Sequence, residues 1–359
     1  MQPLSGVTVL DLTRLLPGPF ASWLLRSWGA RVVKVEDPTL GDYLREVQPL
    51  WFNHLNAGAE SMAVDLKHPD GRKLFLRLLP QVDMVLEGFR PGVMERLGLS
   101  YDEMARQNPA IVLVSLSGYA ANGPHRDRAG HDLNYMARSG LLSLMEGAPA
   151  FQLGDLTSGL MAAAGGLAAV LGARASGKGT HVQVSILETL RALGSLQALE
   201  AMMGLELPRD EMLLGGALPC YRLYWTADGG QVSLAALETK FWVKFCEAVN
   251  RPEWIPRHSD PELKEELAAL FRSKTLWEWG QVAERHPDAC LDPVLRVGQA
   301  VEDRTELQPV RFARQRPSSR GKAPGRGQHT LTFLREMGFS EQEILTLAAE
   351  GCITVTPAD

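Results

Sequence analysis

The chain has 359 residues, of which 45% are hydrophobic and 22% are charged, and these values are typical of a folded protein with two globular domains. Its formal net charge of −5 argues against a nucleic-acid-binding protein, because such proteins neutralise phosphates with clustered Lys and Arg. The basic stretch 311–326 also contains Pro, Ser and Gly, which favours a solvated loop. Four widely spaced cysteines and no signal-like start predict a reduced, cytoplasmic chain without structural zinc or disulfides.

Strand-like and helix-like segments alternate through the first 120 residues. Strands are predicted at 7–12, 31–36, 62–66, 83–89 and 110–119, with helices at 19–30, 70–82 and 92–108 between them. This alternation predicts an α/β fold, with a large Rossmann-like domain whose mainly parallel sheet is covered by helices on both faces. Ligands of such sheets bind at the carboxyl ends of the strands. No GxGxxG motif follows the first strand, so the sequence gives little support for the binding of a nicotinamide or flavin dinucleotide.

Two long helices are predicted at 156–174 and 185–204. The apolar part of the first, 156–173, is just long enough to mimic a membrane span. Its Gly and Ala residues and its flanking charges instead favour a buried helix that another helix or strand approaches closely. We therefore expect no membrane partner and no nucleic-acid partner.

The second half of the chain predicts a smaller α+β domain at 205–325. It begins with a hairpin at 221–237, turning at Asp228–Gly230, and short helices follow at about 239–250, 261–272 and 276–285. The large domain is then 1–204, with 326–359 returning to it. In this tail, Ser340 and Glu343 form a predicted capping box at the start of a helix.

Three side chains are candidates for chemistry because of their contexts. His131 lies in "AGHDLNY", Asp155 in "FQLGDLTSG", and Glu238 lies between the hairpin and a helix. Taken singly, each has a simpler interpretation. His131 beside Asp132 is typical of a polar turn, Asp155 of a helix cap that contributes about 1 kcal/mol, and Glu238 of a carboxylate at a helix start.

Five segments together resemble the class III CoA-transferase superfamily, the CaiB/BaiF group, over nearly the whole chain. They are "PLSGVTVLDLTRLLPGPFASWLLRSWGARVVKVEDPTLGD" (3–42), "DLKHPDGRKLFLRLLPQVDMVLEGFRPGVMERLGLSYD" (65–102), "LSGYAANGP" (116–124), "LGDLTSGLMAAAGGLAAVLGARASGKGTHVQVSILE" (153–188) and "HTLTFLREMGFSEQEI" (329–344). The resemblance implies an enzyme whose substrate is an acyl-CoA. Coenzyme A is then part of the substrate, and no cofactor is bound permanently.

The superfamily contains two main chemistries, and the resemblance gives Asp155 the central role in both. Transferases use this aspartate as a nucleophile and pass CoA between carboxylates. The α-methylacyl-CoA racemases move the proton next to the thioester carbonyl, and they add a histidine in a "GHD" motif and a glutamate after the small-domain hairpin. This chain has both, as His131 and Glu238, and lacks the "GGGGQ"-type loop of transferases, so the racemase branch is the closer match.

Racemisation needs a base, an acid on the opposite face, and donors for the enolate oxygen. We expect His131 and Asp155 to exchange the roles of base and acid, with Glu238 orienting His131 and stabilising its imidazolium. Asp155 should have a raised pKa if it is partly buried. The backbone N–H of Asp132, at a predicted helix start, is the expected donor to the enolate oxygen.

The resemblance also implies contacts with CoA. These fall on Asp65, Leu66 and Lys67 of "DLK", on Leu86, Glu87 and Arg90 of "LEGFR", and on Gly130 and Tyr135 of the "GHDLNY" loop. The chain departs from the racemase pattern where Asp37 replaces an arginine. The 3′-phosphate of CoA is then expected to be held by Lys34 or Arg45, or to be held weakly.

The family forms interlocked homodimers in which each subunit is threaded through its partner. The resemblance therefore predicts a site shared between subunits, with Glu238 facing His131 and Asp155 from the other chain. Two alternatives to a racemase stay open: a CoA-transferase acting through an intermediate on Asp155, and a CoA-thioester-binding protein that has lost turnover. The acyl group cannot be predicted from residue types, beyond an apolar pocket near Leu15 and Leu16.

Overall fold

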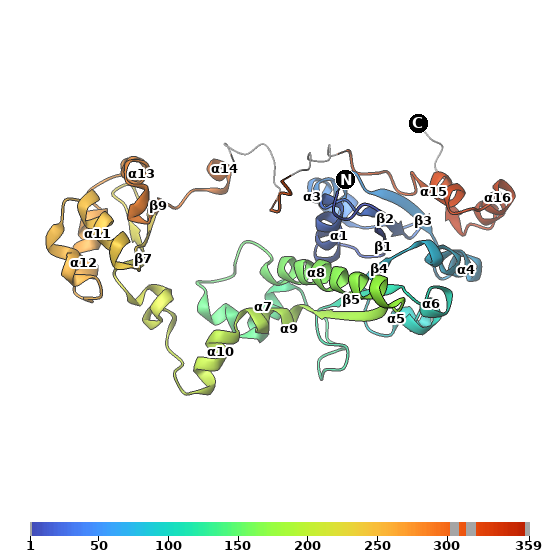
Figure 1. The fold of residues 1–359 in the computed structure, drawn as a ribbon, viewed down its shortest axis with the longest axis horizontal. Helices are drawn as coiled ribbons and strands as arrows, with labels where there is room; N and C mark the ends of the chain where they lie inside the picture. Colours follow the sequence, from blue (N-terminus) through green and yellow to red (C-terminus); the bar gives the residue numbers. More distant parts are fainter. Residues whose placement is uncertain (1, 302–308, 314–320, 356–359) are drawn as a thin grey trace. The chain divides into compact units, whose positions relative to one another are not determined.

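The structure, a computed structural model, describes residues 2–301, 309–313 and 321–355. The chain forms two compact units, unit 1 with residues 1–196 and 310–359, and unit 2 with residues 197–309. Figure 1 shows the elements of both.

A seven-stranded sheet organises unit 1, and its strand order is β10-β3-β2-β1-β4-β5-β6. The strands are β1 (Thr8–Asp11), β2 (Arg31–Glu36), β3 (Glu60–Val64), β4 (Met84–Glu87), β5 (Val112–Ser117), β6 (Thr180–Ser185) and β10 (Ile353–Thr354). All pairings are parallel except that of β10 with β3. The order of β1 to β6 is that of a doubly wound fold, whose strand order reverses between β1 and β4. The predicted mainly parallel α/β sheet is confirmed.

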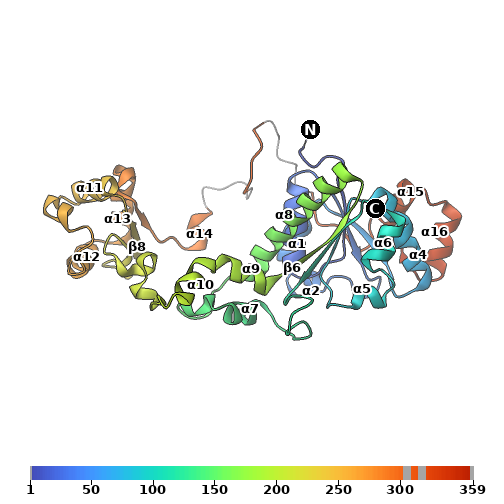
Figure 2. The ribbon, with the colours of Figure 1, turned by 60° about the horizontal axis from the view of Figure 1, so that its bottom comes forward.

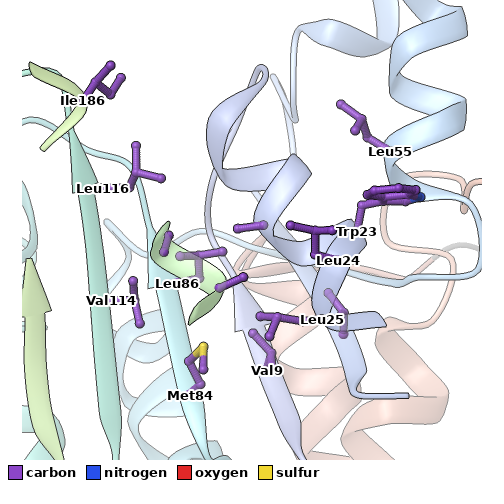
Figure 3. Packing of buried hydrophobic residues seen from close by; sticks show 14 of the residues in the cluster. Val9, Trp23, Leu24, Leu25, Leu55, Met84, Leu86, Val114, Leu116 and Ile186 are labelled. Carbon is purple, nitrogen blue, oxygen red and sulfur yellow. The ribbon is translucent and has the colours of Figure 1, made fainter. Parts of the chain in front are cut away.

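One face of this sheet is covered by α1 (Pro17–Ser27) and α8 (Leu153–Ser176), as Figure 2 shows. Pro17 occupies the first position of α1, where a missing N–H costs nothing. Figure 3 shows the side chains between α1 and the sheet, including Val9, Leu24 and Met84, all at most 2% exposed. Strands buried on both faces explain the continuous apolar runs of the sequence.

Small residues bring α8 close to its neighbours. A Cβ on Gly166 would lie 2.7 Å from Cε of Met84, and one on Gly159 would lie 2.4 Å from the carbonyl oxygen of Pro17. The close approach predicted for the apolar segment 156–173 is therefore confirmed. The helix is long and apolar enough to cross a membrane by length and composition, and 39% of its most apolar window is buried.

The opposite face of the sheet is covered by α4, α6, α15 and α16 (Figure 2). The helices of unit 1 not yet given are α2 (Leu44–Val47), α3 (Pro49–Asn56), α4 (Pro69–Leu78), α5 (Val93–Arg96), α6 (Tyr101–Gln107), α7 (Asp132–Ser139), α9 (Ile186–Leu193), α15 (Thr330–Glu336) and α16 (Glu341–Ala349). The capping box predicted for the tail is present in α16, where Ser340 N donates to Glu343 at 2.8 Å. Phe333 and Ile344 of the tail are buried in one cluster with Phe75 of α4, so the tail packs on unit 1.

Unit 2 is an α+β unit built on the predicted hairpin. Strands β7 (Tyr221–Trp225) and β8 (Gln231–Ala235) pair antiparallel, and β9 (Leu291–Pro293) adds to β8. Its helices are α11 (Thr239–Ala248), α12 (Leu263–Phe271), α13 (Leu276–Arg285) and α14 (Val297–Ala300). A core of aromatic side chains, including Trp242, Phe271 and Trp279, fills the space between sheet and helices.

Several elements differ from the sequence predictions. Strand β6 lies in the "THVQVS" segment, for which no strand was predicted, and the predicted helix 185–204 is broken at Gly194 into α9 and α10 (Ser195–Met202). The predicted helix 92–108 is two short helices, because Ser100 caps a new start at α6.

The units divide at 196/197 and 309/310, rather than at the predicted 204/205 and 325/326. The return of the chain begins before 326, because the carbonyl oxygens of Lys322 and Pro324 accept hydrogen bonds from Gly58 N at 3.1 Å and Arg45 at 2.8 Å. These bonds fasten the segment to unit 1.

Candidate active site

A cavity of about 870 Å³ lies in unit 1 at the carboxyl ends of the parallel strands. Its walls come from the loops that follow β1 to β5, together with the start of α7, the start of α8 and Ile186 at the start of α9. The loops after β1 and β4 meet at the point where the strand order reverses, which is the usual ligand position in open α/β sheets.

His131 lies at the N-terminus of α7. It is the cap residue of this helix, and its backbone N–H donates to Oδ1 of Asn134 at 3.1 Å. The imidazole is solvent-exposed and lines the cavity. Since α7 begins at Asp132, the first orphan N–H groups of the helix follow His131 directly, as the sequence predicts.

Asp155 lines the same cavity from the start of α8. It is the third residue of that helix, and the cap position is Gln152, so the interpretation of Asp155 as a helix cap is wrong. Gly154 is helical and buried, which means that it is needed for space rather than for backbone freedom. A Cβ there would lie 2.9 Å from Oδ1 of Asp132, from Cγ2 of Ile186 and from Cδ1 of Leu190.

The environment of Asp155 favours its neutral form. Burial, followed by the negative charge of Asp132, raises the pKa of the Asp155 carboxyl to about 7. The predicted raised pKa is thus confirmed. A carboxyl group with this pKa is present in both protonation states near neutral pH, as a group that alternates between acid and base requires.

Tyr135 and Gly130 form one wall of the cavity. The Tyr135 hydroxyl donates to the carbonyl oxygen of Gly130 at 2.6 Å, and its ring packs edge-on against Tyr119 with the centroids 5.1 Å apart. Burial and the charge of Asp155 raise the pKa of Tyr135 to about 12, so the hydroxyl stays protonated. Gly118 is obligatory here, because a Cβ would lie 2.2 Å from the tyrosine oxygen.

Five cations line the cavity. Lys67 and Arg90 were predicted from their motifs, whereas Arg14, Arg126 and Arg128 were not. All five are solvent-exposed, which suits them to an anionic ligand. A signal for two of the missed residues was present, because Arg126 and Arg128 stand within five residues of His131 in "HRDRAGH".

The other residues expected to contact CoA divide into two groups. Asp65 and Leu66 line the cavity with Lys67. Leu86 and Glu87 lie at the end of β4, are at most 5% exposed and are not among the lining residues. Glu87 instead accepts the N–H of Phe89 at 2.7 Å, and burial raises its pKa to about 7. It shapes the loop that carries Arg90 rather than facing the cavity.

Lys34 and Arg45, the two cations expected to hold the 3′-phosphate of CoA in place of an arginine at position 37, make contacts within the protein instead. Lys34 is fully buried, with Nζ 3.0 Å from Oδ2 of Asp42 and 3.0 Å from the carbonyl oxygen of Thr13. Arg45 makes two hydrogen bonds to Glu36, at 2.7 and 2.9 Å. Neither lines the cavity, so the expectation that they hold a phosphate is corrected. Asp37 itself closes the turn after β2 by accepting the N–H of Thr39 at 2.9 Å.

Glu238 belongs to unit 2, whereas His131 and Asp155 belong to unit 1. It is the cap residue of α11 and is exposed. The residues that line the unit 1 cavity therefore include two of the three predicted catalytic groups. In the described ranges, no cluster of three or more His, Cys, Asp or Glu side chains could hold a metal ion.

An open, mainly parallel sheet with a cation-lined cavity, a carboxyl group and an imidazole at its strand ends defines an α/β protein with a cavity whose lining suits an anionic ligand. Comparison with known proteins identifies which kind. The family model described as CoA-transferase family III matches residues 4–330, and the chain belongs to this family.

Relatives of known sequence cover nearly the whole chain. It is 33% identical to the alpha-methylacyl-CoA racemase of Homo sapiens, over 98% of this chain and 97% of that protein. It is also 33% identical to a probable fatty acyl-CoA transferase of Mycobacterium tuberculosis, Rv3272, over 93% of this chain and 98% of the relative. A crystal structure of Rv3272 superposes with a TM-score of 0.81 and 31% identity, covering 93% and 99% of the two chains. The relatives therefore include both racemases and transferases.

Proposed function

We propose that the protein is an α-methylacyl-CoA racemase-type enzyme, which moves the α-proton of a 2-methylacyl-CoA thioester. The observation that carries this proposal is the presence in one cavity of the His131 imidazole and of the Asp155 carboxyl, whose pKa is about 7. An imidazole and a carboxyl group are the side-chain types that most often act as general base and general acid. A cavity of this volume also suits a large, mostly buried ligand.

The reaction is two proton transfers. One base removes the α-proton and becomes protonated, the electron pair moves onto the thioester oxygen, and the acid on the opposite face returns a proton to the α-carbon. His131 and Asp155 exchange these roles according to the enantiomer bound. The enolate oxygen accepts the N–H of Asp132 at the start of α7, where the helix dipole favours negative charge.

Substrate binding follows from the lining of the cavity. Coenzyme A is part of the substrate, its phosphates facing exposed cations such as Arg90 and Lys67 and its chain running past Asp65, Gly130 and Tyr135. The branched acyl group then lies against the loop after β1, where Leu15 lines the cavity.

The third catalytic group, Glu238, is proposed to come from a partner subunit of an interlocked homodimer. Its role is to hold the His131 imidazole and to stabilise its protonated form. The exposed apolar side chains of α8, Leu160, Met161 and Leu171, support a dimer, because a helix of this composition normally has its apolar surface covered.

A CoA-transferase is the second candidate. Asp155 lines the cavity, and family relatives such as the mouse succinyl-CoA:glutarate CoA-transferase, 29% identical over 98% of this chain, are transferases by name. In this reaction the Asp155 carboxylate attacks the thioester carbonyl and expels the CoA thiolate, which gives an acyl anhydride. Hydroxylamine that attacks the aspartyl carbonyl of this anhydride would leave a hydroxamate on Asp155 and release the acyl group as a carboxylate.

The experiment is incubation with a 2-methylacyl-CoA in D2O, with deuterium at the α-carbon measured by mass spectrometry. We expect rapid uptake by the wild type and a loss of about 10²-fold or more in His131→Ala and Asp155→Asn. The matched control is His125→Ala, which removes an imidazole from the same loop that is not among the lining residues and should keep exchange. No exchange with any branched acyl-CoA would refute the proposal.

A further inference from the structure

The carboxylate of Asp132 joins the two helices that carry His131 and Asp155. Its Oδ1 accepts the backbone N–H of Asp155 at 2.9 Å. The third N–H of a helix is one of its orphan donors, and Gln152 at the cap position of α8 contributes no side-chain hydrogen bond. Asp132 therefore caps α8 from α7, across 23 residues of sequence.

This contact is buried and closely packed. Asp132 is 8% exposed, and a Cβ on Gly154 would lie only 2.9 Å from its Oδ1. His131 directly precedes Asp132 in the chain, and Asp155 directly follows Gly154. One hydrogen bond therefore fixes the start of α7 relative to the start of α8, and with it the two proposed proton-transfer residues.

We propose that the Asp132 side chain is a positioning residue of the proton-transfer site, which sets both the placement and the ionisation of Asp155. This inference rests on the proposed function and adds a side-chain role to the residue whose backbone N–H faces the enolate. The carboxylate holds the start of α8 against α7, and its negative charge opposes ionisation of the neighbouring Asp155 carboxyl.

Few other charged or titratable groups near Asp155 compete with the effect of the Asp132 charge on its ionisation. Tyr135 faces Asp155 from α7 as a neutral phenol, Arg90 approaches Tyr135 from the loop after β4, and His131 stands at the start of α7. From α9, the exposed Glu188 is paired with Arg191 at 2.9 Å. After burial, Asp132 is the charge that raises the pKa of Asp155. Removing this charge while keeping an acceptor oxygen therefore separates the electrostatic role from the capping role.

The test compares Asp132→Asn with Asp132→Ala in the full-length protein. The Asn variant keeps the oxygen that caps α8, so it should keep the melting temperature while the Asp155 pKa falls. The Ala variant loses the cap as well, so its melting temperature should fall below that of the wild type and of Asp132→Asn. The side-chain carboxyl carbons of aspartate are labelled with 13C and titrated by NMR, with Asp155→Asn used to assign the signal.

The pH profile of α-exchange gives the second readout. With the enantiomer that uses Asp155 as its base, the rising limb of the pH–rate profile should move to lower pH in Asp132→Asn, by the same amount as the Asp155 pKa. A purely structural role of Asp132 would not cause this shift. An unchanged Asp155 titration in a folded Asp132→Asn protein would overturn the inference. Absence of exchange in the wild type would instead refute the proposed function, while the titration still reports on Asp132.

Discussion

The Asp155 carboxyl group lies in a partly buried position beside a like charge, and both features stabilise its protonated form. Asp155 was predicted from its "GD" motif and His131 from its "GHD" motif, in both cases through the resemblance to the family rather than from the residues alone. The side-chain role of Asp132 was not predictable in the same way. It depends on a contact between α7 and α8, which no local pattern encodes.

The raised pKa of Asp155 makes the stability of the protein depend on pH. Its folded pKa of about 7 exceeds the ordinary value of 3.8, so between these values the folded state holds more protons than the unfolded state. The wild type should therefore lose stability as pH rises from about 4 to about 7. Asp155→Asn does not ionise, so its free energy of unfolding relative to the wild type should increase across this window and level off above it. Urea unfolding at a series of pH values measures this, and a pH-independent difference would contradict it.

The buried pair of Lys34 and Asp42 supports the loops around the cavity. Lys34→Met leaves a buried carboxylate unpaired and should reduce the free energy of unfolding by about 3–5 kcal/mol. The matched control is Lys73→Met, because Lys73 pairs with Asp70 at 2.7 Å on the surface and should contribute less than about 1 kcal/mol. Both losses are measured by urea unfolding. Similar losses for the two variants would show that the buried pair has no special role.

At the level of elements, periodicity predicted the strands that are buried on both faces and missed β6. The "THVQVS" segment lies at the edge of the sheet, and most of its side chains are only partly buried or exposed. Its short alternating pattern was overlooked between the two long helices that were predicted at 156–174 and 185–204. The final strand, β10, has two residues, too few for any periodicity to show.

Gly154 tests the packing between α7, α8 and α9. Gly154→Ala places a Cβ 2.9 Å from three neighbouring side-chain atoms, so it should push α8 from α7, destabilise the protein by about 1–3 kcal/mol and slow α-exchange. The matched control on the same helix is Gly172→Ala, which meets no atom within 4 Å and should stabilise by about 0.5–1 kcal/mol. Thermal unfolding and exchange rates distinguish the two variants. A Gly154→Ala protein that behaves like Gly172→Ala would contradict the close packing.

At the scale of the whole molecule, the two units could be predicted from the change in texture after the long helices. Their exact limits could not, since the return of the chain to unit 1 is fixed by hydrogen bonds that the carbonyl oxygens of Lys322 and Pro324 accept from Gly58 and Arg45, rather than by a sequence pattern. The cations around the cavity were only partly predicted for the same reason. Arg14 and Arg126 reach the cavity from separate loops that only the folded sheet brings together.

The proposed homodimer predicts that the exposed apolar face of α8 is an interface. Met161→Lys places a charge on this face, where Met161 is 50% exposed, and should weaken dimerisation at least tenfold. The control is Leu345→Lys on α16, where Leu345 is 62% exposed. This variant should leave the association unchanged. Sedimentation velocity over a range of concentrations measures both. Equal association of the two variants, or a monomeric wild type, would contradict this interface.

The most direct test of the account uses one pure enantiomer of a 2-methylacyl-CoA in D2O, with the products and the protein analysed from the same reaction. A racemase predicts deuterium at the α-carbon, formation of the other enantiomer, and an unmodified Asp155 after hydroxylamine treatment. Transfer of CoA to a free carboxylate with a hydroxamate on Asp155 and no α-deuterium would contradict the account and identify the protein as a transferase.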